Sequence, residues 1–267
     1  MVKFFLIVVF IYLCLIAVLY FFQRNILFVP SRSKPILSES LVPEMTEVIL
    51  ATEDDLKLVS WFHRGEADKQ LIIYFQGNAG NIGNRDYKAR FFINSGYSVL
   101  LVGYRGYGGN PGKPSEVGLT RDAEAALNFA QSEAFSNEDI VLYGESLGTG
   151  VAVNLAQSKE FHALVLEAPY TSIERIASKR YWFVPVRYLL KDKFDTINKA
   201  KQLQSPTLLL HGDADRVIPI SYGKQLFEQL NNPKEFAVFH GGGHSDLFDY
   251  GAGEKVNKFL SKPPRRN

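Results

Sequence analysis

Short, almost wholly apolar runs alternate with helix-length amphipathic stretches along most of this chain, and that alternation constrains its fold more than any other feature. Runs such as Leu71–Phe75 and Thr207–Leu210 lack a polar face, which is typical of parallel strands covered by helices on both sides. The pattern therefore predicts an α/β fold with a doubly wound, mostly parallel sheet.

Strands are expected at Glu47–Ala51, Leu56–His63, Leu71–Gln76, Ser98–Tyr104, Ile140–Gly144, Ala163–Glu167, Thr207–His211 and Glu235–Phe239, the first two as an antiparallel pair. Helices are expected at Arg85–Ser95, Ser115–Glu133, Leu147–Gln157, Ser221–Leu230 and Leu247–Leu260.

The length and charge of the chain limit its domain count and its partners. With 267 residues it can form one large α/β domain, but not two domains of ordinary size with linkers. The formal charge is +2, with acidic and basic residues interspersed. That distribution lacks the concentrated positive field of nucleic-acid-binding proteins, so we expect no nucleic-acid partner. The single cysteine, Cys14, excludes an internal disulfide.

The segment Phe4–Phe22 is apolar and uncharged over nineteen residues. As a helix it would be about 28 Å long, close to the thickness of a bilayer core. A cleaved signal peptide is the alternative, but its apolar core is shorter and ends at small residues, whereas this run ends in Leu19–Phe22. We expect a single-pass transmembrane anchor. The flanking basic residues are too evenly balanced to orient it.

The strongest local motif is Gly144-Glu145-Ser146-Leu147-Gly148, which joins a predicted buried strand to a predicted helix. A serine on such a sharp strand-to-helix turn exposes its hydroxyl above the sheet, and the flanking glycines avoid crowding in the turn. The pentapeptide alone is weakly specific, but the strand and helix around it strengthen the prediction. Ser146 is therefore the candidate nucleophile.

A serine hydroxyl needs a base and an orienting acid to attack at neutral pH. Both follow in the order acid then histidine, at the ends of two later strands, where open α/β sheets build their sites. The acid is Asp213 or Asp215, because both follow the strand ending at His211. The base is His244 rather than His240, because His244 follows the glycine run Gly241–Gly243 instead of ending the strand.

The chemistry also needs an oxyanion hole. We expect its donors to be the backbone N–H of Leu147, directly after the candidate nucleophile, and that of Asn78 in the Gly-rich loop 77–83. That loop could instead cradle a phosphate, but it matches neither common nucleotide-binding pattern. We therefore expect no cofactor and no metal.

Together these motifs resemble the N-terminally membrane-anchored α/β-hydrolases related to fungal bud-emergence proteins and to animal alpha/beta hydrolase domain-containing proteins, which are grouped with serine aminopeptidase-like hydrolases. The motifs that carry the resemblance are 77–83, Tyr104–Gly109, 144–148, His211–Pro219 and Gly243-His244. The resemblance implies an α/β-hydrolase fold with a short helical cap, and it assigns the acid to Asp215. The chain departs from the family in having Gln76 in place of a histidine and Gly103 in place of an aspartate.

We expect a transmembrane anchor (1–24), a tether or a loop lying over the domain (25–46), and an α/β-hydrolase domain (47–267) with a cap insertion at about 170–199. The cap is aromatic and basic, with Tyr181–Val186 followed by Arg187 and Lys191. Beside an anchor, such a cap suits hydrophobic acyl chains at a charged lipid surface, although the same aromatics could simply pack the cap onto the domain.

The expected function is cleavage of carboxylic esters or thioesters through an acyl-enzyme on Ser146, with acyl-containing small molecules, lipids or acylated proteins as substrates. The alternative is a serine peptidase, because the same three residues also cut amides. A non-enzymatic membrane scaffold is the third hypothesis. A scaffold would be expected to lack one of the three residues, and this chain has them all.

Overall fold

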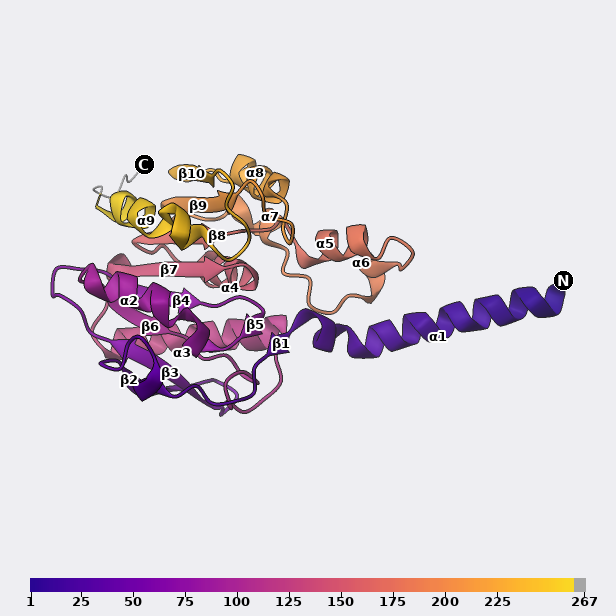
Figure 1. The fold of residues 1–267 in the computed structure, drawn as a ribbon, viewed down its shortest axis with the longest axis horizontal. Helices are drawn as coiled ribbons and strands as arrows, with labels where there is room; N and C mark the ends of the chain where they lie inside the picture. The colour runs from indigo at the N-terminus through magenta and orange to yellow at the C-terminus, as the bar shows by residue number, and fades with distance from the viewer. Residues whose placement is uncertain (262–267) are drawn as a thin grey trace.

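The computed structural model describes residues 1–261, and its centre is an eight-stranded sheet (Figure 1). The strands are β2 (Thr46–Ala51), β3 (Lys57–His63), β4 (Leu71–Phe75), β6 (Ser98–Leu101), β7 (Ile140–Glu145), β8 (Ala163–Glu167), β9 (Thr207–Gly212) and β10 (Lys234–Phe239). Their order is β10-β9-β8-β7-β4-β6-β3-β2. From β6 to β10 all pairings are parallel, whereas β3 runs antiparallel to β6 and β2. The predicted mostly parallel sheet is confirmed.

Helices cover both faces of the sheet, because alternate residues of each buried strand point to opposite cores. Leu71 and Ile73 of β4 pack with α3 (Glu116–Ser132), α4 (Leu147–Ala156) and α8 (Ile220–Gln229). Ile72 and Tyr74 pack with α2 (Asp86–Asn94) and α9 (Ala252–Leu260). The last predicted helix is divided in two. A 3₁₀ turn, η4 (Leu247–Tyr250), ends at Gly251, whose φ of +86° interrupts the helical path before α9.

The N-terminal run forms one helix, α1 (Val2–Leu27), that projects from the domain (Figure 1). It has no buried residue, and it is long and apolar enough to cross a membrane by length and composition. It also continues past the predicted end of the anchor at residue 24.

The segment predicted as a tether, 25–46, lies against the domain. Its strand β1 (Val29–Pro30) pairs in parallel with β5 (Ala79–Gly80), which lies within the Gly-rich loop 77–83. Phe28, Val42 and Met45 are buried. The segment therefore covers part of the domain. The division of the chain into anchor, tether and hydrolase domain stays a prediction.

The cap lies between β8 and β9 in sequence. It contains α5 (Ile173–Arg180), α6 (Val186–Leu189) and α7 (Thr196–Ala200). Figure 1 shows α5 and α6 standing away from the sheet on the same side as α1. The predicted short helical cap is confirmed.

Three further 3₁₀ turns occur in the described residues: η1 (Leu37–Glu39), η2 (Ile82–Arg85) and η3 (Asn137–Asp139).

Candidate active site

Ser146 stands on the sharp turn between β7 and α4. Its φ is +51°, in a region that residues with side chains rarely adopt. The flanking glycines permit the turn, because a Cβ on Gly148 would lie 2.1 Å from the carbonyl oxygen of Phe75, and one on Gly144 would lie 2.5 Å from that of Gly148. The local sequence therefore dictates that the hydroxyl stands above the sheet, where Ser146 is largely buried but lines a cavity.

The structure brings the three predicted side chains together. His244 Nε2 is 2.9 Å from Ser146 Oγ, and His244 Nδ1 is 2.7 Å from Asp215 Oδ2. Asp215 follows β9 and His244 follows β10, and these strands are adjacent at one side of the sheet. One hydroxyl, one imidazole and one carboxylate thus form a continuous chain of hydrogen bonds.

Asp215 is held in one orientation by its own loop. Its Oδ1 accepts hydrogen bonds from the backbone N–H groups of Val217 and Ile218, each at 2.8 Å. Burial alone would raise the pKa of Asp215, but hydrogen bonds from His211 and His244 outweigh it and hold that pKa below its ordinary value of 3.8. Asp215 is therefore a carboxylate at neutral pH, and it can stabilise a positive charge on His244.

The rejected alternatives, Asp213 and His240, pair with each other outside this chain of bonds. Their side chains are 2.8 Å apart, and that of His240 is 88% exposed. Asp213 also accepts a hydrogen bond from the backbone of Gly241. His211 is buried and contacts the carbonyl of Ile218 at 2.8 Å, so it braces the loop that carries Asp215.

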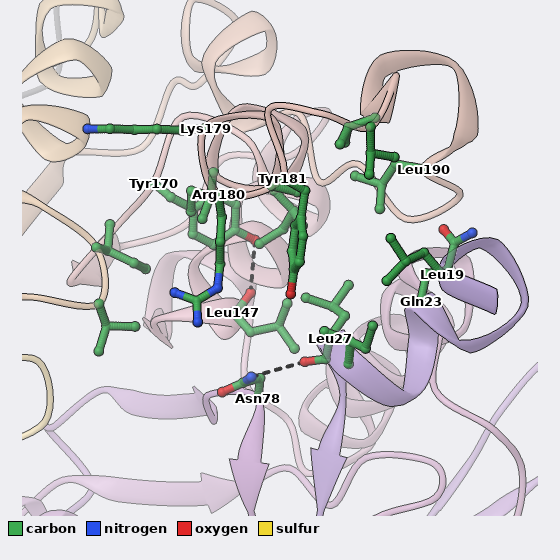
Figure 2. Close-up of a pocket in the computed structure, with 18 of the residues that line it drawn as sticks. Leu19, Gln23, Leu27, Asn78, Leu147, Tyr170, Lys179, Arg180, Tyr181 and Leu190 are labelled. Carbon is green, nitrogen blue, oxygen red and sulfur yellow. Dashed lines mark hydrogen bonds between the residues drawn. The ribbon is translucent and has the colours of Figure 1, made fainter. Parts of the chain in front are cut away.

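The predicted oxyanion residues Asn78 and Leu147 line the same cavity as Ser146. The carbonyl of Asn78 accepts hydrogen bonds from Val29 N and Tyr107 Oη, both at 2.9 Å. Its side-chain amide donates to the carbonyl of Leu27 at 3.0 Å (Figure 2). Contacts with Leu27, Val29 and Tyr107 therefore fix this loop, and motif reasoning did not anticipate them.

The two departures from the family lie beside this loop. A Cβ at Gly103 would be 2.0 Å from the carbonyl oxygen of Val59 and 2.7 Å from Asn110 Nδ2. The Asn110 side chain binds both the N–H and the carbonyl of Val59, at 2.8 and 3.1 Å. A glycine at 103 makes room for this bridge. Gln76 is buried, and its amide has no hydrogen-bond partner among residues 1–261.

A buried charge cluster lies behind the Ser146 turn, and sequence reasoning missed it. The ammonium group of Lys88 is 2.8 Å from a carboxylate oxygen of Glu167 and 3.2 Å from one of Glu145. Glu145 also pairs with Arg85 at 2.8 Å and accepts a hydrogen bond from Tyr74. Burial would raise the pKa of Glu145, but the charges of Lys88 and Arg85 outweigh it and lower that pKa.

A cavity of 720 Å³ opens from Ser146 between the cap and α1. Figure 2 shows Arg180 and Tyr181 extending into it from the cap, opposite Asn78 and Leu27. Most of its lining is apolar, as in sites for hydrophobic ligands. Among residues 1–261, no group of three or more His, Cys, Asp or Glu side chains is placed to hold a metal ion.

The fold and this arrangement of side chains are those of an α/β serine hydrolase. Comparison with known proteins agrees, since the profile of the family described as serine aminopeptidase, S33, matches residues 66–194 and 186–250, and the chain belongs to that family. An uncharacterised protein of Mycobacterium tuberculosis is 35% identical over 227 residues, which cover 84% of this chain and 81% of the relative.

Human alpha/beta hydrolase domain-containing protein 17B is 34% identical over 204 residues, which cover 73% of this chain and 67% of the relative. The solved structure of the Pyrococcus furiosus esterase Pf2001 has a TM-score of 0.70 at 22% identity, covering 87% of this chain and 98% of that chain. This likeness concerns the fold. The expected family, the α/β-hydrolase fold and the assignment as a hydrolase are confirmed.

Proposed function

We propose that this protein cleaves carboxylic esters or thioesters through an acyl-enzyme on Ser146. The observation that carries the proposal is the pair of contacts made by His244, 2.9 Å to Ser146 Oγ and 2.7 Å to Asp215. His244 takes the proton of Ser146 as the hydroxyl attacks the acyl carbon, while Asp215 fixes the tautomer and stabilises the imidazolium. His244 then protonates the leaving group, and water releases the acyl group from Ser146 by the reverse sequence.

Negative charge forms on the acyl oxygen during both steps, and the backbone N–H groups of Asn78 and Leu147 are proposed to stabilise it. Removal of one such donor typically lowers kcat by about 10² to 10³-fold. The support for Leu147 is its position directly after Ser146 at the start of α4. The support for Asn78 is its place in the same cavity and the three hydrogen bonds that fix its carbonyl and its side chain.

The proposed substrates are acyl lipids or acylated proteins. The apolar cavity beside Ser146 suits an acyl chain, because apolar walls favour the transfer of hydrocarbon out of water. The α1 helix is proposed to anchor the enzyme in a membrane as a single span, which would keep such substrates close. A peptidase is the second candidate, and the support for it is the serine aminopeptidase family to which the chain belongs.

The test is labelling of the purified full-length protein in detergent with a fluorophosphonate probe, beside Ser146→Ala. Labelling that disappears in Ser146→Ala is the expected result, and labelling that persists there would overturn the role of Ser146. Nitrophenyl esters of increasing chain length are then compared with aminoacyl nitroanilides. Faster turnover of long-chain esters supports the proposal, whereas faster turnover of the anilides would replace it by the peptidase.

A further inference from the structure

The cap is bonded to α1 at two separate levels along the helix. Near its C-terminal end, Arg24 pairs with Asp192 at 2.7 Å, and Gln23 binds the backbone of Leu189 and Lys191 at 3.2 and 2.8 Å. Far from that end, the hydroxyl of Tyr12 donates to the carbonyl of Phe183 at 2.8 Å. The cap therefore lies along the helix instead of stopping where the helix leaves the domain (Figure 1).

This placement has a consequence for the depth of the cap. Tyr12 and Arg24 are twelve positions apart, which is about 18 Å of helix. One leaflet of a bilayer contributes about 15 Å of hydrocarbon, and helix tilt shortens the depth reached along the normal. If α1 spans the membrane with Arg24 among the headgroups, a layer about 5–7 Å thick, the part of the cap beside Tyr12 lies below the polar boundary and within the adjoining leaflet. We call residues 181–188 the cap tip.

The side chains of the cap tip suit that environment. Trp182 and Tyr188 are 82% and 83% exposed, and Phe183 is exposed as well. Large aromatic side chains with a polar atom are enriched where a membrane meets water. Between Glu174 and Asp192 the sequence holds five basic residues and no acidic residue: Arg175, Lys179, Arg180, Arg187 and Lys191. An aromatic tip flanked by positive charge complements an anionic lipid surface.

The candidate active-site cavity is continuous with this contact. One face of α1, with residues three or four positions apart, forms a wall of the cavity that contains Ser146. Its residues are Ile16, Leu19, Tyr20, Gln23, Ile26 and Leu27. On the opposite wall are cap residues that include Ile176, Tyr181 and Val184. The cavity thus extends from Ser146 along α1 as far as Ile16, which lies eight positions before Arg24.

We propose that the cap tip inserts into the leaflet adjoining the catalytic domain, and that the cavity between cap and α1 admits an acyl chain directly from that leaflet. This inference rests on the proposed function, and it narrows the substrates to molecules whose acyl chain already resides in the membrane. The reacting carbonyl group reaches Ser146 while the chain moves between apolar walls, so the hydrocarbon does not cross water.

Tryptophan fluorescence tests the insertion, because the chain has only two tryptophans. Trp61 is buried in the domain core, and Trp182 is in the cap tip. The full-length protein is reconstituted in phosphatidylcholine–phosphatidylglycerol vesicles whose phosphatidylcholine is brominated either near the carbonyl end or near the methyl end of its chains. The signal of Trp182 is the difference between the wild type and Trp182→Phe, and Ser146→Ala repeats the measurement without hydrolysis.

The expected result is loss of most Trp182 emission in brominated vesicles, little quenching by aqueous iodide, and no quenching of Trp61 by either. Quenching of Trp182 by iodide but not by bromolipid would overturn the insertion. Flotation of the same vesicles separates the causes. If the protein floats while Trp182 remains accessible to water, the membrane anchor stands and the insertion of the cap is wrong. If the protein does not float, both the anchor and the insertion are wrong. Fluorophosphonate labelling of Ser146 reports on the proposed function in every case.

A variant tests the route of the acyl chain. Trp182→Glu places a charge in the cap tip, and Ile49→Glu makes the same kind of change at an exposed position of β2, on the far edge of the sheet. Trp182→Glu should slow hydrolysis of a long-chain ester embedded in vesicles and leave a soluble short-chain ester unaffected. Ile49→Glu should change neither rate. Equal loss on both esters for Trp182→Glu, or no loss on either, would overturn entry from the leaflet.

Discussion

The side-chain amide of Asn78 donates a hydrogen bond to the carbonyl of Leu27, the last residue of the apolar helix, across 3.0 Å. This contact joins the proposed oxyanion loop to the helix that is proposed to enter the membrane. The carbonyl of Asn78 in turn accepts hydrogen bonds from Val29, just after α1, and from Tyr107. The direction of the Asn78 N–H therefore depends in part on the end of α1 and the segment that follows it.

Asn78→Ala keeps the backbone N–H and removes only the bond to Leu27. A single neutral hydrogen bond contributes about 1 kcal/mol, so kcat/KM should fall by no more than about tenfold. The measurement is steady-state hydrolysis of a nitrophenyl ester by the full-length protein. Tyr107→Phe, which removes a bond to the carbonyl of Asn78, should give a loss of the same order. A loss as large as that of Ser146→Ala would contradict a purely positioning role for the side chain.

The two aspartates and two histidines of these loops allow a matched test of the proposed hydrogen-bond chain from Ser146 through His244 to Asp215. Asp215→Asn should lower kcat by about 10⁴-fold, because an amide no longer holds the required tautomer of His244. Asp213→Asn is the control, since Asp213 binds exposed His240 instead. The same logic applies to His244→Gln and His240→Gln. Comparable losses for Asp213→Asn and Asp215→Asn would mean that the assignment is wrong.

The buried cluster behind the turn predicts a large loss of stability. Lys88→Met leaves Glu145 and Glu167 buried without their shared cation, and breaking a buried ion pair on one side costs about 3–5 kcal/mol. Lys159→Met removes a lysine from the more exposed pair with Glu124, where the expected change is about 0–1 kcal/mol. Denaturant unfolding of both variants measures the difference. Equal changes would show that the cluster does not carry this stability.

Sequence patterns predicted the parts of the molecule that depend on local chemistry. Buried strands have continuous apolar runs, so the expected bounds of β8 match the structure and those of β7 and β9 differ by one residue at the C-terminal end. The turn at Ser146 was predictable because its glycines have a steric function that the spacing displays. The order of strands, acid and histidine then placed Asp213 or Asp215, together with His244, near Ser146, and the family resemblance assigned the acid to Asp215.

The other features of the fold and the site could not be predicted from the sequence, because they depend on contacts between residues far apart in the chain. Nothing near Lys88 in sequence reveals that Glu145 and Glu167 neutralise it, since they belong to two neighbouring strands that follow it by more than fifty residues. A charged residue four positions before Phe92, on the apolar face of a predicted helix, was the available signal. Likewise, composition left a tether and a loop lying over the domain equally open for 25–46, because the pairing of Val29 with Ala79 leaves no mark in either sequence.

The ionised state of Glu145 predicts how the stability of the fold depends on pH. Its pKa in the folded protein is below the ordinary value of 4.5, because Lys88 and Arg85 outweigh the effect of burial. A carboxyl group with a lowered pKa stabilises the fold above its unfolded-state pKa, and that stabilisation is lost as the pH falls towards the folded-state value. Glu145→Gln removes the charge, so the difference in Tm between wild type and variant should be largest above about pH 5 and should shrink towards pH 3.

Glu133→Gln is the control, because Glu133 pairs with Arg64 at the surface and surface pairs contribute little. Circular dichroism melts of the three proteins in detergent across this range give the answer. A wild-type to Glu145→Gln difference that stays constant with pH would mean that Glu145 is not held ionised by Lys88 and Arg85.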